Sequence, residues 1–444
     1  MTSGLGELRR ILGPVTGAAI GVGVAVGAGI LRSPAEIAAA LPSGPWIFGA
    51  WLLGALVASL DVLILAEMAS SVPRVGGLVA YLRLSFGPLA AFLCGWSMLL
   101  VTWPGSLAVV AVVAGEVLHG GIGSLGGDTT WEERAIAAGL IAASGAANLF
   151  GLRVGARVEI TLFVAKVVLL AGLFVAAMFA APAAAAPAVA GSVVFPATTL
   201  ALFAAVGGAM QNVIFSYDGY ADAVYVAGET KDPGRALPRA LFTSLVTITG
   251  LYLLLNAAFV HVLGAQGLAQ SKFAALDVVR AAFGDAGGAV LTVVAFVVLL
   301  GAVNAYFLTG PRIARLLAEE GLAVPALGRV ATNGSPVAAT LLQTLVAIAF
   351  ALTNTFDELL AIMVPIMSAT TALVAIGLLV QRRRAPERPR PFRVPAAPLV
   401  VGLQVLLGAG MLASFVQYDR RAVVVDAGVL AFGAAVYAWV RRRR

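Results

Sequence analysis

The sequence is poor in the residues on which metal sites and disulfide frameworks depend. Among 444 residues there is one cysteine, Cys94, and there are two histidines, His119 and His261. A single cysteine excludes an intramolecular disulfide framework, and so few Cys and His exclude a metal site built from these ligands. We therefore expect neither a metal nor a cofactor, and we expect the protein not to be an enzyme.

Charged residues are also scarce. Asp, Glu, Lys and Arg make up 11% of the chain and hydrophobic residues 60%, whereas roughly 25% of a soluble domain is charged. Apolar windows of about 20 residues are long enough to cross a bilayer as helices. The sequence therefore predicts an all-α integral membrane protein. It predicts twelve spans, near residues 14–41, 45–70, 88–118, 134–150, 156–181, 198–226, 237–263, 286–311, 337–354, 358–381, 397–416 and 424–440.

The few cations are unevenly placed. The net charge is +7, and most of the Lys and Arg residues fall in segments that share one side of the membrane if the N-terminus is cytoplasmic. Cytoplasmic loops are enriched in Lys and Arg, so the surplus is a topology signal rather than a sign of nucleic-acid binding. It predicts a plasma (inner) membrane protein with both termini in the cytoplasm.

The first predicted span contains an unusual stretch, GAAIGVGVAVGAGILRSP, at residues 17–34. Each glycine inside a helix costs roughly 0.5–1 kcal/mol relative to alanine, so several together argue against a plain membrane anchor. The triplet Gly27-Ala28-Gly29, followed by Pro34, predicts an interruption. Two half-helices that meet there leave free N–H groups at one end and free carbonyls at the other, which suits a ligand with a carboxylate and an ammonium. The alternative is a helix-packing glycine face.

A second interrupted span is predicted at residues 207–222, GGAMQNVIFSYDGYAD. Each break falls in the first span of a five-span block, at 14–181 and 198–381, and five spans per block give the two blocks opposite orientations. Interrupted segments at matching places in inverted halves are typical of transporter binding sites. The remaining segments are a cytoplasmic N-terminus at 1–13, a basic cytoplasmic loop at 382–396, and two further helices with a cytoplasmic C-terminus at 397–444.

Four stretches carry a family resemblance. They are GAGIL at 27–31, AEMASSVPRVGGLVAYL at 66–82, FSYDGY at 215–220 with GETKDPGRALPRAL at 228–241, and RPFRVP at 390–395. With them the chain resembles the amino acid–polyamine–organocation superfamily, and within it bacterial permeases related to the L-type and cationic amino acid transporters. The resemblance implies a leucine-transporter-type fold: twelve transmembrane helices and an inverted 5+5 repeat with helices 1 and 6 broken.

The resemblance also implies where substrate docks. The substrate carboxylate would meet the N–H groups of Ala28 and Gly29, and its ammonium would meet carbonyls near Ala25, Phe215 and Asp218. Alanine replaces the family's usual serine at 28, which leaves the backbone contact but removes a hydroxyl. Phe215 resembles an aromatic gate; the alternative is an ordinary core or lipid-facing aromatic. The full predicted substrate set is Ala25, Gly27, Ala28, Gly29, Ile30, Phe215, Ser216, Tyr217, Asp218, Gly219 and Asn304.

Lys166 lies deep within the fifth predicted span. A cation far from either interface is costly and by default marks a coupling site; the alternative is snorkelling to an interface. In several relatives a lysine here occupies the place of a sodium ion, and Lys166 resembles that pattern. The eighth span has Ala302 where sodium-coupled members place hydroxyls, so we expect sodium independence.

Several acids have open roles. Asp218 either pairs with the substrate ammonium or with Lys166, or it caps the second half-helix of span 6. Asp222 is assigned to packing or to a vestibule, and Asp61 must face protein or water. Glu67 and Glu229 are expected to form cytoplasmic gate ion pairs with arginines such as Arg74 and Arg235. Because Asp218 is the one charge expected in the site, a small or neutral amino acid is the predicted substrate.

The sequence thus predicts a secondary active amino acid transporter in the lipid bilayer. It would work by alternating access, without sodium, as a proton symporter or an amino acid exchanger. The alternatives are a nutrient sensor, or a transporter for an amine or polyamine, on the same fold. Neither the individual amino acid nor a partner subunit follows from the sequence.

Overall fold

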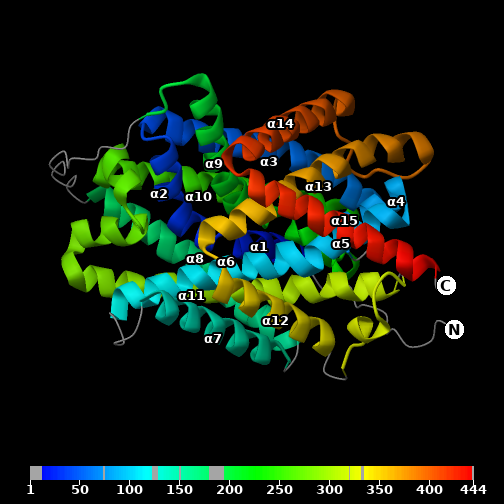
Figure 1. Ribbon diagram of the computed structural model, residues 1–444, viewed down its shortest axis with the longest axis horizontal. Coiled ribbons are helices and arrows are strands. Elements are labelled where there is room, and N and C mark those ends of the chain that lie inside the picture. The colour runs from blue at the N-terminus through cyan, green and yellow to red at the C-terminus, as the bar shows by residue number, and fades with distance from the viewer. Residues whose placement is uncertain are drawn as a thin grey trace.

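The structure is a computed structural model that describes residues 13–73, 76–122, 129–149, 152–179, 195–319, 321–331 and 335–442. The expected N-terminal segment 1–12 and most of the loop between the two blocks lie outside these residues. The described chain folds into helices (Figure 1). They are α1 (Pro14–Ala25), α2 (Ala28–Ala40), α3 (Gly44–Ser71), α4 (Gly77–Phe86), α5 (Pro88–Ser97), η1 (Met98–Thr102), α6 (Trp103–Ile122), α7 (Thr129–Leu149), α8 (Leu152–Phe179), α9 (Thr199–Tyr217), η2 (Tyr220–Glu229), α10 (Pro233–Gln270), α11 (Ala274–Glu319), η3 (Pro325–Gly328), α12 (Val337–Thr353), α13 (Phe356–Arg384), α14 (Ala397–Tyr418) and α15 (Arg420–Arg442).

Each predicted span has a helix at its place, whereas the predicted number of twelve membrane-crossing helices stays a prediction. In the described part of the chain, 8 helices are long and apolar enough to cross a membrane, or 9 if the bent pair α1 and α2 forms one span. The segments Val164–Phe179 of α8 and Val337–Thr353 (α12) are apolar but shorter. Multiple apolar helices make this a multi-pass membrane protein.

Prolines and glycines explain where several helices begin and bend. Proline occupies the first turn of α1, α3, α5 and α10, where its missing N–H costs nothing. Gly264 and Gly284 have left-handed φ of 67° and 66° and interrupt α10 and α11. The predicted spans 237–263 and 286–311 therefore end and begin at these two kinks.

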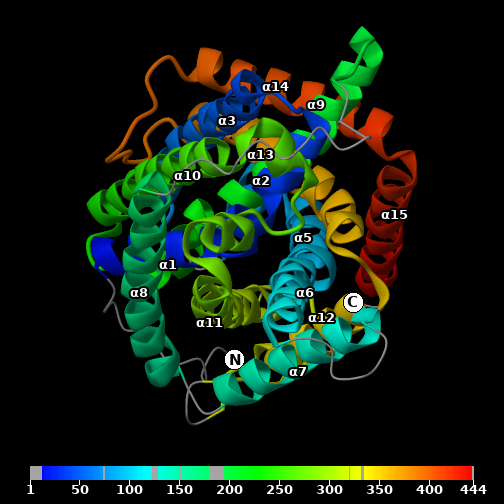
Figure 2. The ribbon, with the colours of Figure 1, turned by 90° about the vertical axis from the view of Figure 1, so that its left-hand side faces the viewer.

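The bundle places α2 at its centre and α15 at its edge. The segment α2 packs against α9, α10, α11 and α6, and it lies among them in Figure 2. In the apolar stretch of Pro88–Gly120, 83% of the residues are buried inside the protein, whereas in that of α15 only 11% are. Large apolar side chains such as Leu56 and Val246 are exposed on outer faces, which fits a surface solvated by lipid.

Candidate functional site

The first helix break lies between α1 and α2. Val26 (φ −79°, ψ 86°) and Gly27 (φ −153°, ψ −129°) leave helical geometry, and the two helix axes differ by 42°. The interruption is thus one residue earlier than the predicted triplet. Ala28 and Gly29 form the first turn of α2, where backbone N–H groups have no partner within the helix. The cap Gly27 has no side chain to satisfy them.

The second break lies between α9 and η2. Asp218 ends α9 with its N–H donating to the carbonyls of Ile214 (2.9 Å) and Phe215 (3.1 Å). Gly219 follows with φ +116°, a left-handed conformation that favours glycine. The chain then continues as the 3₁₀ helix η2 rather than as an α-helix.

The two breaks touch each other. A Cβ built on Gly219 would lie 2.5 Å from the backbone nitrogen of Ala25, so a larger residue would push the breaks apart. Tyr252 of α10 spans the junction: its hydroxyl lies 2.7 Å from the carbonyl of Ala25 and 2.7 Å from that of Ser216. A hydroxyl has one hydrogen, so it donates to one of these carbonyls at a time. Sequence reasoning missed Tyr252, which lies in an apolar run without a distinguishing signal.

Two glycines of the first break are also packing glycines. A Cβ on Gly29 would lie 2.6 Å from Cα of Ser216, and a Cβ on Gly27 would lie 3.0 Å from Cβ of Ala302. The break therefore fits closely against α9 on one side and α11 on the other. This stretch is therefore both a helix interruption and a helix-packing face.

The other predicted substrate residues are divided among different neighbours. The ring of Phe215 meets that of Phe356 edge-on, with centroids 6.2 Å apart. Ile30 is fully buried in the core. The Ser216 hydroxyl donates to the carbonyl of Asn212 (2.7 Å), and the Tyr217 hydroxyl to that of Trp51 (3.3 Å). Asn304 accepts from Asn148 of α7 at 3.2 Å, so this contact ties α11 to α7 rather than to either break.

Lys166 reaches α1 from α8. Its side chain is 1% exposed, and its Nζ donates to the carbonyl of Gly23 at 2.7 Å. Gly23 lies one turn before the break, so the ammonium holds the end of α1 where carbonyls lose their helical partners. Snorkelling does not fit so buried a position.

A cavity adjoins the second break. Of the predicted substrate residues, Tyr217 and Asp218 line it, and none from the first break does. Asp61 and Asp222 also line it. The hydroxyl of Tyr220 donates to Oδ2 of Asp61 at 2.7 Å, so Asp61 faces both protein and the cavity, as its position in the middle of a span required.

Charged and aromatic side chains surround Arg32 of α2. Its guanidinium pairs with Glu116 and with Glu36 at 3.1 Å, and it lies 5.1 Å from the centroid of the Phe356 ring. Phe356 in turn contacts Phe215. An ion pair thus sits over the aromatic pair beside the second break.

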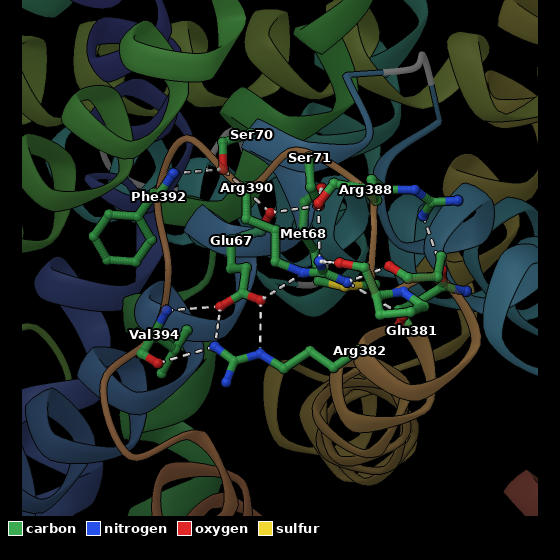
Figure 3. Close-up of polar contacts among 12 residues, drawn as sticks. Glu67, Met68, Ser70, Ser71, Gln381, Arg382, Arg388, Arg390, Phe392 and Val394 are labelled. Carbon is green, nitrogen blue, oxygen red and sulfur yellow. Dashed lines mark hydrogen bonds and ion pairs between the residues drawn. The ribbon is translucent and has the colours of Figure 1, made fainter.

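A second ionic cluster surrounds Glu67 near the end of α3 (Figure 3). Glu67, which is 0% exposed, accepts from Arg382 at 2.8 and 2.5 Å and from the N–H of Val394 at 2.6 Å. Arg390 approaches it at 3.3 Å. The partners of Glu67 therefore come from the end of α13 and the loop before α14. Glu67 thus pairs with arginines, as expected, and the expected partner Arg74 lies outside the described residues, as does the side chain of Glu229.

We expect Glu67→Gln to lower the free energy of unfolding by about 3 kcal/mol, because removal of one partner leaves buried charges uncompensated. Thermal unfolding of the purified protein measures this. Glu387→Gln changes an exposed glutamate of the same loop and is the matched control. Equal thermal midpoints for the two variants would contradict a stabilising role for the cluster.

Two broken helices in mutual contact inside an apolar bundle define this protein as a membrane transporter. Comparison with known proteins gives the family: the profile of the amino acid permease family matches residues 12–434. The chain belongs to the amino acid permease family, within the superfamily expected from its motifs, and is a transporter rather than an enzyme.

Individual relatives are distant but cover most of the chain. The serine/threonine exchanger SteT of Bacillus subtilis (strain 168) is 23% identical over 98% of this chain and 98% of its own length. The b(0,+)-type amino acid transporter 1 of Mus musculus is 26% identical over 89% of this chain and 81% of its own. The Asc-type amino acid transporter 1 of Mus musculus is 24% identical over 87% and 73%.

Proposed function

We propose that this protein is a secondary active amino acid transporter that works by alternating access. The observation that carries the proposal is the direct contact between the two helix breaks, at Gly219 against Ala25 and through Tyr252. The uncapped N-terminus of α2 offers donors to a carboxylate. The carbonyls at the end of α9 offer acceptors to an ammonium. Both are backbone features, so they suit the α-carboxylate and α-ammonium groups that all amino acids share.

Access to this site requires movement. Ala28 and Ile30 are 1% and 0% exposed, so a substrate reaches the first turn of α2 only if the broken helices shift against α10 and α11. We propose the clusters around Arg32 and Glu67 as the two gates. By the positive-inside rule the Glu67 cluster is cytoplasmic, as are both termini. Movement of the inverted five-span blocks, 14–181 and 198–381, against each other would open the site first to one side of the membrane and then to the other.

We propose that transport does not depend on sodium and that exchange is its main mode. Lys166 brings a positive charge to the carbonyl of Gly23, and a methyl group of Ala302 faces Gly27. Sodium requires several oxygen ligands, and this corner of the site presents an ammonium and a methyl instead. The exchanger name of the Bacillus relative favours exchange over proton symport.

Uptake into proteoliposomes tests these proposals. We expect the purified protein to take up an L-amino acid at the same rate when N-methylglucamine replaces sodium outside. We expect internal amino acid to stimulate uptake severalfold, because an exchanger returns faster when loaded. A screen of the twenty amino acids, by competition, identifies the substrate. Uptake that requires sodium would contradict the coupling proposal, and no binding of any amino acid would contradict the function.

A further inference from the structure

The first two turns of α10 and the loop before α14 carry cations without partners. Arg235, Arg239 and Arg393 are all exposed. Within the described part of the chain, none of these three side chains has a hydrogen bond or an ion pair. Nearby acids are few: Asp232 is the one acid among residues 230–243, and residues 388–396 contain none. The surplus of positive charge is therefore left for a partner outside the chain.

Packing joins this loop to the helix. The ring of Phe392 lies 5.6 Å from that of Phe242 of α10, measured between centroids. A Cβ on Gly234 would lie 3.0 Å from Cγ of Pro391, so the start of α10 fits closely against the loop. Each of the exposed arginines lies within three residues of one of these contacts. The three cations therefore share one surface, which we name the basic patch: Arg235, Arg239 and Arg393.

The face of α10 that carries the basic patch continues as an apolar stripe. Exposed residues recur every three or four positions along this helix, at 235, 239, 243, 246, 250 and 254, and such spacing keeps them on one helix face. Val246 and Leu254 on this face are 70% and 48% exposed. Because a helix rises about 1.5 Å per residue, Val246 lies roughly 10 Å further along the axis than Arg239. That distance is within the roughly 15 Å of hydrocarbon in one leaflet, so the arginines lie where a headgroup would and the stripe where its chains would.

We propose that the basic patch binds the phosphate of an anionic phospholipid in the cytoplasmic leaflet, with an acyl chain along Val246 and Leu254. Charge complementarity selects this occupant, because guanidinium groups bind phosphate through paired hydrogen bonds and anionic lipids attract basic segments at this membrane surface. The apolar stripe beside the arginines favours a lipid over a soluble anion. No residue of the two helix breaks takes part, so this role is separate from the proposed transport. Since Arg390 and Val394 of the same loop hold Glu67, a bound lipid also stabilises that cluster.

Titration of the purified full chain with lipid, followed by native mass spectrometry, tests the proposal. The probes are phosphatidylglycerol and phosphatidylcholine with identical acyl chains, so they differ in the charge of the headgroup. We expect the wild type to bind phosphatidylglycerol at least about tenfold more tightly. Arg235→Gln, Arg239→Gln and Arg393→Gln should each weaken this binding about fivefold, the contribution of one arginine near an anionic surface, and leave phosphatidylcholine binding unchanged. Saturating phosphatidylglycerol should raise the thermal midpoint of the wild type by at least about 2 °C, because a ligand of the folded state stabilises it.

Arg329→Gln is the matched control, because it removes the same charge elsewhere. Arg329 is also exposed, but it follows η3, which packs on α11 and α12, so its loss should leave lipid binding unchanged. An equal loss of binding in this variant would show that only net charge matters and would overturn the proposal. Equal affinity of the wild type for the two lipids would overturn it as well. The third probe is millimolar sn-glycerol 3-phosphate: if it raises the thermal midpoint as much as phosphatidylglycerol does, the ligand is a soluble phosphate and the lipid assignment is wrong.

Discussion

Replacing Gly29 with valine is expected to abolish transport. Any Cβ at this position would lie 2.6 Å from Cα of Ser216, and contacts between carbon atoms normally lie at about 3.5–4.0 Å. The helices α2 and α9 must therefore separate by about 1 Å, which moves the N–H groups of α2 away from the second break. Uptake into proteoliposomes is the measurement, and Gly29→Ala is expected to show a milder form of the same loss.

The control is Gly250→Val, because a Cβ at Gly250 of α10 meets nothing within 4 Å. Overpacking at Gly29 costs about 1–3 kcal/mol, so the thermal midpoint should fall in the Gly29 variants and hold in the control. A double variant with Ser216→Gly adds a sharper test. The closest contact is to the backbone of Ser216, so removal of its side chain should not restore uptake. Near-normal uptake by Gly29→Val would show that substrate does not use this break.

The second large effect is expected at Lys166. Replacement by methionine keeps most of the side-chain volume but removes the hydrogen bond to the carbonyl of Gly23. A hydrogen bond from a charged group contributes about 1.5–3 kcal/mol, which corresponds to roughly tenfold to hundredfold in an equilibrium. We therefore expect Lys166→Met to transport at least tenfold more slowly. The thermal midpoint should fall by less than the loss of this bond alone would give, because a neutral side chain needs no desolvation.

Lys272→Met is the control for this variant, since Lys272 is 65% exposed and pairs with Glu133 at 3.6 Å. A pH profile then separates two roles of Lys166. If the ammonium stays charged and braces α1, the wild type transports evenly across the neutral range. If Lys166 carries the coupling proton, the wild type depends on pH and the variant does not. Wild-type rates in Lys166→Met would contradict both roles.

Much of the architecture was readable from local pattern. Apolar windows of bilayer length predicted the places where helices are found. The reason is that a backbone in lipid must satisfy its own hydrogen bonds, which a helix does. Clustered glycines located both breaks within one or two residues, because glycine disfavours a helix interior locally. The number of crossings was not settled in this way. Length and apolarity within the described residues identify 8 spans, or 9 with the bent pair α1 and α2, and the twelve predicted spans stay a prediction.

What the sequence determined by itself is the class of protein, the position of the interrupted helices and the buried lysine, because each depends on residues adjacent in the chain. The tertiary structure decided which side chains from distant segments of the chain come into contact. Tyr252 joins the two breaks, Glu67 pairs with Arg382, and Asp61 and Asp222 share one cavity. These partners are brought together by helix packing, which sets distances between segments far apart in the chain and leaves no local signal in any one of them.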